Sequence, residues 1–83
     1  MSYFVYILEC SDGTLYTGIT KDISKRLNEH NHKDKGAKYT KARRPVKLLY
    51  HENSENRSTA SKREYVIKKL TRLKKLQLIQ SLS

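Results

Sequence analysis

The sequence predicts an α+β domain in which one sheet of three strands is covered by helices, in the order β-β-α-β-α-α. Two apolar and aromatic runs near the N-terminus are separated by a short turn, and a third run lies in the middle of the chain. The segments after the second and third runs repeat apolar residues at helical spacing. With 83 residues, 36% of them hydrophobic, residues 1–83 are expected to form one domain with one thin core.

The first two strands are predicted to form a hairpin. Tyr3 to Glu9 is hydrophobic on both alternating faces, as in a strand covered on both sides, so it should be central in the sheet. Leu15 to Thr20 is the return strand across Ser11-Asp12-Gly13. This three-residue loop has glycine at the position that needs a positive φ.

The length of this loop decides where the hairpin tyrosines point. A three-residue loop pairs Leu8 with Tyr16 and Tyr6 with Gly18, which places both tyrosines on one face. A two-residue loop would place them on opposite faces. The first register is preferred, because Gly18 leaves room beside the Tyr6 ring.

A helix is predicted from Asp22, as its N-cap, to about residue 31. Ile23 and Leu27 form an apolar stripe on it at i and i+4. Arg26 and His30 have the same spacing and lie beside or on this stripe. Both side chains should therefore point toward the sheet.

The C-terminal half is predicted to contain the third strand, Val46 to Glu52, and a helix from about Ser58 to Leu70. Glu64 lies at the border of this helix's buried side, which is made by Ala60, Ile67 and Leu70. A last amphipathic segment from Thr71 should cover the core or present a weak partner surface.

Charge indicates the partner. The chain has 18 Lys and Arg against 8 Asp and Glu, a net charge of +10, and such a surface attracts polyanions by counterion release. Nucleic acid is the expected partner. Much of the excess lies in a stretch with Gly36 and Pro45 that is predicted to be a loop. Its candidate nucleic-acid-binding cations are Lys33, Lys35, Lys38, Lys41, Arg43 and Arg44, and Tyr39 among them has the character of a base-stacking ring.

Other classes of function are disfavoured by composition. The single Cys10 forms no internal disulfide, and no signal sequence or membrane-length apolar run is present, so a cytoplasmic location is expected. A cysteine hydrolase using Cys10 and His30 lacks an orienting third group. His30 and His32 have no cysteine partners for a structural zinc site.

The ordered motifs carry a resemblance. FVY at residues 4–6, LYTG at 15–18, Arg26 eight residues after the glycine, His30 and a helical Glu64 resemble the GIY-YIG nuclease domain. That family includes the N-terminal nuclease domain of UvrC, and this chain is most similar to its small stand-alone members. The resemblance implies a three-stranded antiparallel sheet flanked by helices. It also implies a Mg²⁺-dependent cut of one DNA strand per site, with Mn²⁺ as the alternative metal.

The resemblance also assigns roles. It implies that Tyr6, Tyr16, Arg26 and His30 are catalytic, that Glu64 binds the metal, and that Gly18 is a structural part of the motif. Some letters depart from the family pattern: Phe4 replaces a glycine, Thr17 replaces an isoleucine, and an asparagine found in the last helical region of several members has no clear counterpart.

The chemistry of hydrolysis explains these residue types. A carboxylate with water and phosphate oxygens is a common way to hold Mg²⁺, which suits Glu64. Arg26 offers a permanently charged fork that matches phosphate. A tyrosine with an ordinary pKa near 10 is a poor base at neutral pH, so Tyr6 needs a nearby positive charge or His30. Tyr16 could instead orient water or phosphate, and which tyrosine takes the proton is left open.

Two functions follow as hypotheses. The first is a divalent-metal-dependent endonuclease acting on DNA, in repair or recombination, with RNA as an alternative substrate. The second is a nucleic-acid-binding module that retains the fold without catalysis. A monomer is expected, with any specificity coming from an unidentified protein partner or from DNA shape. Each site residue also has a structural alternative, such as an Arg26 pair with Asp22 or Glu29, or a Glu64 pair with Lys68.

Overall fold

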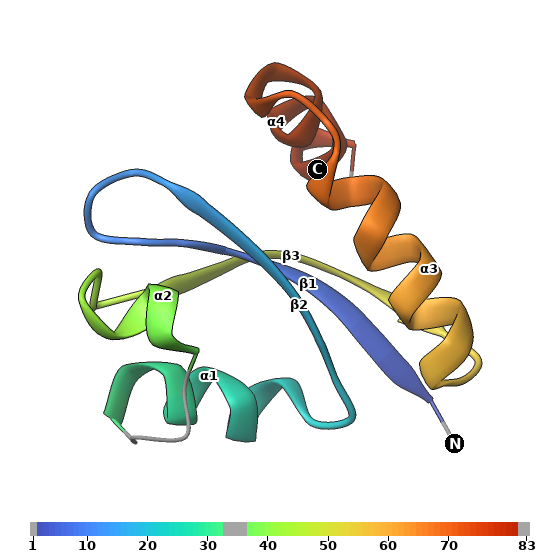
Figure 1. Ribbon diagram of the computed structural model, residues 1–83, viewed down its shortest axis with the longest axis horizontal. Helices are drawn as coiled ribbons and strands as arrows, with labels where there is room; N and C mark the ends of the chain where they lie inside the picture. The colour runs from blue at the N-terminus through green and yellow to red at the C-terminus, as the bar shows by residue number, and fades with distance from the viewer. Residues whose placement is uncertain (1, 33–36, 82–83) are drawn as a thin grey trace.

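A computed structural model describes residues 2–32 and 37–81, and it contains a three-stranded antiparallel sheet with helices on both sides (Figure 1). The strand order is β2-β1-β3, so the first strand is central as predicted. The elements are β1 (Tyr3–Glu9), β2 (Leu15–Thr20), α1 (Ile23–His32), α2 (Lys38–Lys41), β3 (Lys47–Ser54), α3 (Arg57–Lys68) and α4 (Arg72–Gln80). The predicted fold class is confirmed, with α2 as an additional short helix.

The hairpin between β1 and β2 has the predicted register. Leu8 pairs with Tyr16 and Tyr6 pairs with Gly18. Gly13 in the turn has a φ of +83°, a value that favours glycine. The alternation of side chains along a strand then places Tyr6 and Tyr16 on one face, where their ring centroids lie 6.5 Å apart.

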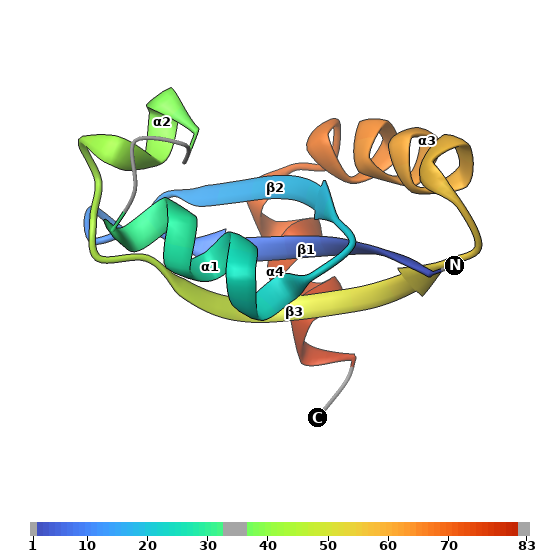
Figure 2. The same cartoon turned by 90° about the horizontal axis from the view of Figure 1, so that it is seen from below.

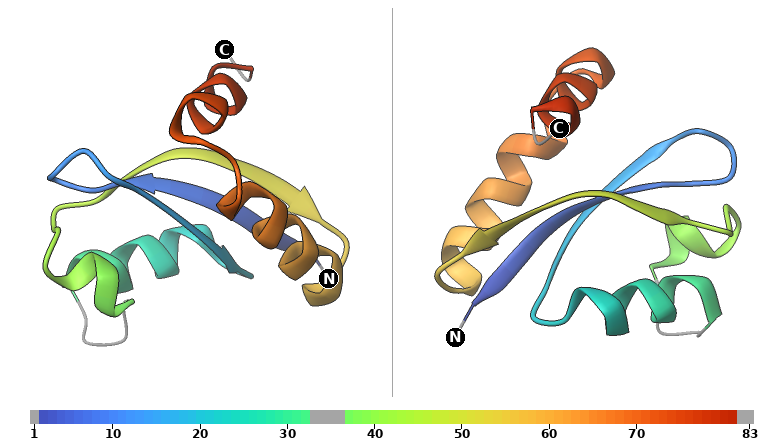
Figure 3. Two further views of the ribbon diagram at one scale, coloured as in Figure 1. Left: turned by 45° about the horizontal axis from the view of Figure 1, so that its top comes forward. Right: turned by 180° about the vertical axis from the view of Figure 1, so that it is seen from behind.

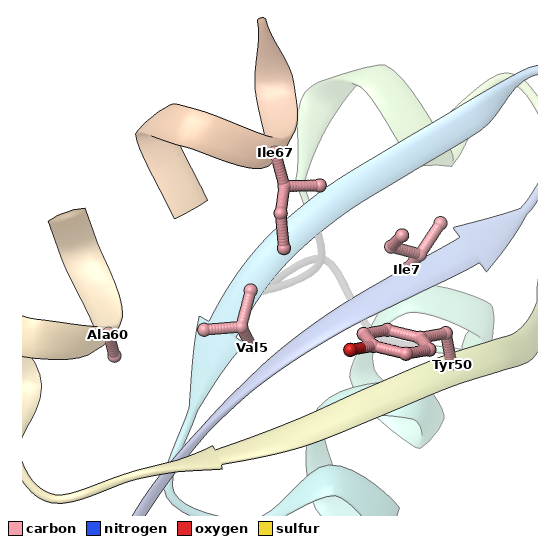
Figure 4. Close-up of a cluster of buried hydrophobic side chains, with 5 residues drawn as sticks. All are labelled: Val5, Ile7, Tyr50, Ala60 and Ile67. Carbon is pink, nitrogen blue, oxygen red and sulfur yellow. The ribbon is translucent and has the colours of Figure 1, made fainter. Parts of the chain in front are cut away.

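Each face of the sheet has its own buried cluster, and α1 and α2 lie on one side with α3 and α4 on the other (Figure 3). Figure 4 shows the cluster on the α3 side, which joins side chains of β1, β3 and α3: Val5, Ile7, Tyr50, Ala60 and Ile67. The second cluster joins Tyr6, Leu8, Cys10 and Val46, with Tyr16, Leu27 and Leu48 packed against it. The central strand is therefore covered on both faces, which explains its continuous apolar run.

The N-termini of α1, α3 and α4 are fixed by side-chain caps. Asp22 caps α1, because its carboxylate accepts a hydrogen bond of 3.0 Å from the backbone N–H of Lys25. Asn56 and Thr59 form a reciprocal capping box at α3. Thr71 caps α4 by accepting from the N–H of Lys74. Only the first of these caps was predicted from the sequence.

The basic stretch is not the continuous loop that the sequence predicted. Lys38–Lys41 form α2, whose turn is closed by hydrogen bonds of 3.0 and 3.2 Å from the N–H groups of Thr40 and Lys41 to the Ala37 carbonyl. Residues 33–36, which include Lys33, Lys35 and Gly36, lie outside the described residues. The helix forms because Ala37 to Lys41 contains no glycine or proline to break a turn.

The C-terminal end of α1 is tied to the start of β3. The Asn31 side chain donates to the Val46 carbonyl (3.0 Å) and accepts from the Val46 N–H (2.8 Å). The Arg44 guanidinium donates to the backbone carbonyl of His30. A basic side chain at a helix C-terminus satisfies carbonyls that have no partner within the helix. These contacts hold α1 against the sheet in the orientation seen in Figure 2.

Among residues 2–32 and 37–81, no helix has both the length and the apolar character required to cross a lipid bilayer.

Ile67 should carry a large share of the packing between α3 and the sheet, because its side chain is 0% exposed. We expect Ile67→Ala to lower the free energy of unfolding by about 2–5 kcal/mol, through lost burial and the cavity left behind. Val66→Ala is the matched control, since Val66 on the same helix is 51% exposed. Urea denaturation of both variants measures the difference, and equal losses would contradict the assigned packing.

Candidate active site

The polar centre of the molecule is a hydrogen bond between two buried side chains. The Tyr6 hydroxyl of β1 lies 2.9 Å from Nε2 of His30 on α1. Tyr6 is 3% exposed and His30 is 0% exposed. The helical spacing predicted that His30 points toward the sheet, and the structure confirms this orientation.

Tyr16 completes an aromatic group around His30. Its ring lies edge-on to the His30 ring, with centroids 5.3 Å apart and planes at 64°. Gly18 allows the Tyr6 ring to lie close against the β2 backbone. A Cβ atom added at Gly18 would lie 2.5 Å from the Tyr6 hydroxyl oxygen and 2.7 Å from the ring carbon that carries this oxygen. Since real Cβ atoms do not make such contacts, any other residue would displace the Tyr6 ring.

Arg26 lies beside the same hydroxyl. It is hydrogen-bonded to Tyr6 and forms an ion pair of 3.1 Å with Glu29. Its side chain keeps 27% of its surface exposed. Arg26 therefore forms the alternative ion pair with Glu29 and also points toward the sheet, where it contacts Tyr6. Its partly exposed side chain remains accessible to a ligand.

Burial sets the protonation states of the central pair. It raises the pKa of Tyr6 to about 12, with Arg26 opposing the rise and the charges of Tyr16 and Glu64 adding to it. Burial lowers the pKa of His30 to about 4, and the positive charge of Arg26 contributes in the same direction. Both groups are consequently neutral at neutral pH.

Glu64 reaches this group from α3. Its carboxylate has an ion pair of 3.5 Å with Lys68 and a side chain that is 23% exposed. Its charge makes a small contribution to the raised pKa of Tyr6, so the two groups lie within electrostatic range of each other. Tyr6 packs on the α1 side of the sheet, and the convergence of Glu64 with the hairpin tyrosines in one site stays a prediction.

The donor set suits a hydrated Mg²⁺ and not a cation enclosed by protein ligands. Within the part of the chain that the structure describes, no three His, Cys, Asp or Glu side chains cluster as a metal site. Mg²⁺ commonly retains several waters and binds through one or two carboxylates together with substrate phosphate. The partly exposed Glu64 carboxylate fits that mode, since its ion pair with Lys68 is long, at 3.5 Å.

The basic residues near the site have different roles. Lys38 and Lys41 are exposed on α2, while Lys33 and Lys35 are outside the described ranges. Arg43 forms an ion pair of 3.0 Å with Asp12 in the hairpin turn. Arg44 binds the end of α1, as described above. The structure therefore gives the two arginines internal contacts that the sequence did not reveal.

Tyr39 is already engaged by protein groups. Its ring stacks on Tyr16, with centroids 6.0 Å apart and planes at 25°, and the Arg43 guanidinium lies 4.0 Å from its centroid. The side chain is still 39% exposed. In the structure Tyr39 thus packs on Tyr16, and its stacking on a nucleic-acid base stays a prediction.

Sequence reasoning missed one polar contact of the central pair. The Thr40 side chain is 0% exposed, and its Oγ1 lies 2.8 Å from Nδ1 of His30. No motif marks this threonine, because it lies between Tyr39 and Lys41 in a stretch dominated by charge. Cys10 is buried like a small apolar side chain: it is 3% exposed and packs with Leu8 and Val46.

Fold and site together define a nuclease-type α+β domain, and comparison with known proteins agrees. The family described as the GIY-YIG catalytic domain matches residues 2–77. The chain belongs to this GIY-YIG family. Membership supports a nuclease-type function, and nucleases of this family generally use divalent metal ions.

The chain is similar to small proteins designated UPF0213. A UPF0213 protein of Staphylococcus aureus is 60% identical over 79 residues, which cover 95% of this chain and 95% of that protein. One of Desulfotalea psychrophila is 55% identical over 80 residues, covering 96% of this chain and 73% of that protein. The predicted similarity to small stand-alone members is confirmed, because little of the Staphylococcus protein lies outside the match.

Solved structures agree with the fold. A solution NMR structure of a UPF0213 protein from Bacillus halodurans has a TM-score of 0.61 and 44% identity, covering 96% of this chain and 84% of that chain. A protein from E. faecalis, also solved by NMR, has a TM-score of 0.67 and 40% identity, covering 99% and 86%.

The buried His30 should make the fold sensitive to mild acid. Its folded-state pKa of about 4 lies below the ordinary value of 6.5, so the unfolded chain binds the proton more readily. The stabilising contribution is fully present above pH 6.5 and is lost as the pH falls toward 4. Between pH 7 and 5 we expect a loss of about 2 kcal/mol from this residue.

Urea denaturation at pH 7, 6 and 5 tests this expectation. The wild-type free energy of unfolding should fall across the series, and a His30→Gln variant should show a much smaller slope. The titratable and charged groups near the ring are the same in both proteins: Tyr6, Tyr16, Arg26, Glu29 and Arg44. Identical slopes would show that His30 does not titrate in this range.

Proposed function

We propose that this protein is a divalent-metal-dependent endonuclease that hydrolyses phosphodiester bonds of DNA, with a role in DNA repair or recombination. The observation that supports it most is the 2.9 Å contact of Tyr6 with His30. A tyrosine paired with a neutral imidazole has an acceptor for its proton, which a tyrosine that only packs in a strand does not need. Arg26 and Glu64 act on the same hydroxyl.

The roles follow from the geometry. In the proposed reaction, the Tyr6 hydroxyl gives its proton to Nε2 of His30, and the resulting phenolate removes a proton from the attacking water. The pair favours Tyr6 over Tyr16 for this task, because the Tyr6 oxygen has the short bond to His30. The exposed part of Arg26 binds the phosphate and stabilises charge that develops on it.

A divalent cation fits at Glu64, where it would supply positive charge to the phosphate oxygens and to the phenolate that forms nearby. The residues of the protein have separate tasks. Glu64 provides the anionic ligand, and Arg26 orients the phosphate. Tyr16 and Tyr39 stack to form an aromatic wall beside His30. This wall excludes water from one side of His30.

A nucleic-acid-binding module without catalysis is the alternative. It is favoured by the pKa values of the central pair, since about 12 for Tyr6 and about 4 for His30 both oppose proton transfer in the free protein. Tight, salt-sensitive DNA binding with no cleavage under any metal condition would support this alternative. RNA offered in the same assay distinguishes the two nucleic acids.

Removing the metal-binding carboxylate should abolish cleavage. We expect wild-type protein to cut nicked, branched or single-stranded DNA in Mg²⁺ or Mn²⁺, and Glu64→Gln to reduce the rate by at least about a hundredfold. Glu55→Gln is the matched control, because Glu55 is exposed and precedes α3. Cleavage is measured on labelled DNA with both variants and with EDTA. Full activity of Glu64→Gln would contradict the proposed role.

The exposed cations of α2 should form part of the DNA-binding surface. We expect the double variant Lys38→Gln, Lys41→Gln to weaken binding to all DNA sequences and to reduce the salt dependence by about two counterions. Arg43 and Arg44 are left unchanged because of their internal contacts. Fluorescence anisotropy at several salt concentrations measures the effect.

The control for this experiment removes the same charge elsewhere. Lys69 and Lys74 are exposed at the end of α3 and on α4, and Lys69→Gln with Lys74→Gln should weaken binding less. Equal losses from the two pairs would show that the charge acts without a defined footprint.

A further inference from the structure

Behind the Tyr6 and His30 pair, a buried chain of hydrogen bonds continues into α2. Nδ1 of His30 lies 2.8 Å from Oγ1 of Thr40, and the Thr40 hydroxyl donates to the Ala37 carbonyl at 2.8 Å. His30 and Thr40 are both 0% exposed. Bulk water therefore does not compete for these positions, and each hydrogen must be shared among the protein groups.

Counting hydrogens determines the direction of each bond. A threonine hydroxyl has one hydrogen, and the Ala37 carbonyl can only accept, so that hydrogen is used in the bond to Ala37. Oγ1 must then act as the acceptor toward His30. Nδ1 consequently carries the hydrogen of the neutral ring, and Nε2 carries the lone pair.

The other end of the chain agrees with this direction. A guanidinium can only donate, so in its bond with Tyr6 the phenol oxygen accepts from Arg26. The phenol hydrogen is then available for Nε2 of His30, 2.9 Å away. In this arrangement every acceptor in the series of hydrogen bonds from Arg26 to Ala37 receives a hydrogen.

The opposite tautomer leaves the network less satisfied. It would let the Ala37 N–H donate to Nδ1, but this distance is 3.4 Å. The Thr40 hydroxyl would have to turn toward Nδ1 and give up its 2.8 Å bond to the Ala37 carbonyl. The Ala37 carbonyl would keep the N–H groups of Thr40 and Lys41 as donors. At the other end, an Nε2–H would face a Tyr6 oxygen that already accepts from Arg26, and the buried Tyr6 hydroxyl would lose Nε2 as its acceptor, which favours the first arrangement.

We propose that Thr40 is a positioning residue that holds neutral His30 in the tautomer protonated at Nδ1, so that Nε2 is free to take the Tyr6 proton. In that step the Tyr6 O–H bond breaks, an N–H bond forms at Nε2, and a phenolate and an imidazolium remain. The Nδ1–H stays hydrogen-bonded to Oγ1 throughout. This inference rests on the proposed nuclease function for its purpose, whereas the tautomer itself is a property of the free protein.

Threonine suits this position for two local reasons. Its hydroxyl can bond the carbonyl three residues earlier in a helical turn, as it does with Ala37. Its branched Cβ limits the rotation of that hydroxyl, and the methyl group fills the buried space. Valine has nearly the same shape without the oxygen, whereas serine keeps the oxygen without the methyl group.

NMR tests the tautomer without any need for activity. Long-range ¹H–¹⁵N correlation spectra at pH 7 report which imidazole nitrogen carries the hydrogen, and His30→Gln assigns the His30 signals against His32 and His51. We expect Nδ1–H in the wild type and in Thr40→Ser. In Thr40→Val we expect a shift toward the Nε2–H tautomer. Thr17→Val is the matched control, because Thr17 is a buried threonine whose hydroxyl has no partner in the described structure.

The outcomes separate this inference from the proposed function. A wild-type ring protonated at Nε2, or a Thr40→Val spectrum identical to wild type, would overturn the role of Thr40 whether or not the protein cleaves DNA. If Thr40→Val does not fold, the spectra of the wild type and of Thr40→Ser still show which nitrogen of His30 carries the hydrogen. For a protein that cleaves DNA, Thr40→Val should lower kcat about tenfold or more with little change in KM. Thr40→Ser should restore most of that rate.

Discussion

The need to satisfy a fully buried imidazole constrains the whole α1 side of the molecule. His30 is neutral because burial lowers its pKa to about 4, and both ring nitrogens must find partners in the protein. One partner comes from the central strand and the other from α2. The histidine therefore links β1, α1 and α2, and none of them can shift without leaving a polar atom unsatisfied.

Backbone geometry supports this centre from two directions. Gly18 allows the Tyr6 ring to lie against β2, and its position opposite Tyr6 depends on the three-residue hairpin turn. Arg44 and Asn31 fix the last turn of α1, which carries His30. Basic residues that a charge count assigns to nucleic acid are thus partly used inside the fold, so a binding footprint should be sought on Lys38 and Lys41.

Local patterns were sufficient for much of the fold and for part of the site. Strand alternation and turn length predicted the hairpin register, and helical spacing predicted that His30 faces the sheet. Thr40 and Arg44 could not be predicted, because their partners are 10 and 14 residues away and depend on how α2 folds back on α1. The helix α2 itself was hidden because it is one turn long, too short to show periodicity.

The protonation states of the central pair suggest how cleavage would depend on a bound substrate. In the free protein, moving the proton from Tyr6 to His30 costs on the order of 10 kcal/mol, given pKa values of about 12 and about 4. One turnover per second corresponds to an activation barrier of about 17 kcal/mol. The proton transfer alone would use more than half of that barrier. Positive charge near the phenolate lowers the cost, and Arg26 supplies only one such charge. If the protein cleaves DNA as proposed, a cation at Glu64 and a bound phosphate would therefore have to lower this cost before the Tyr6 proton could move.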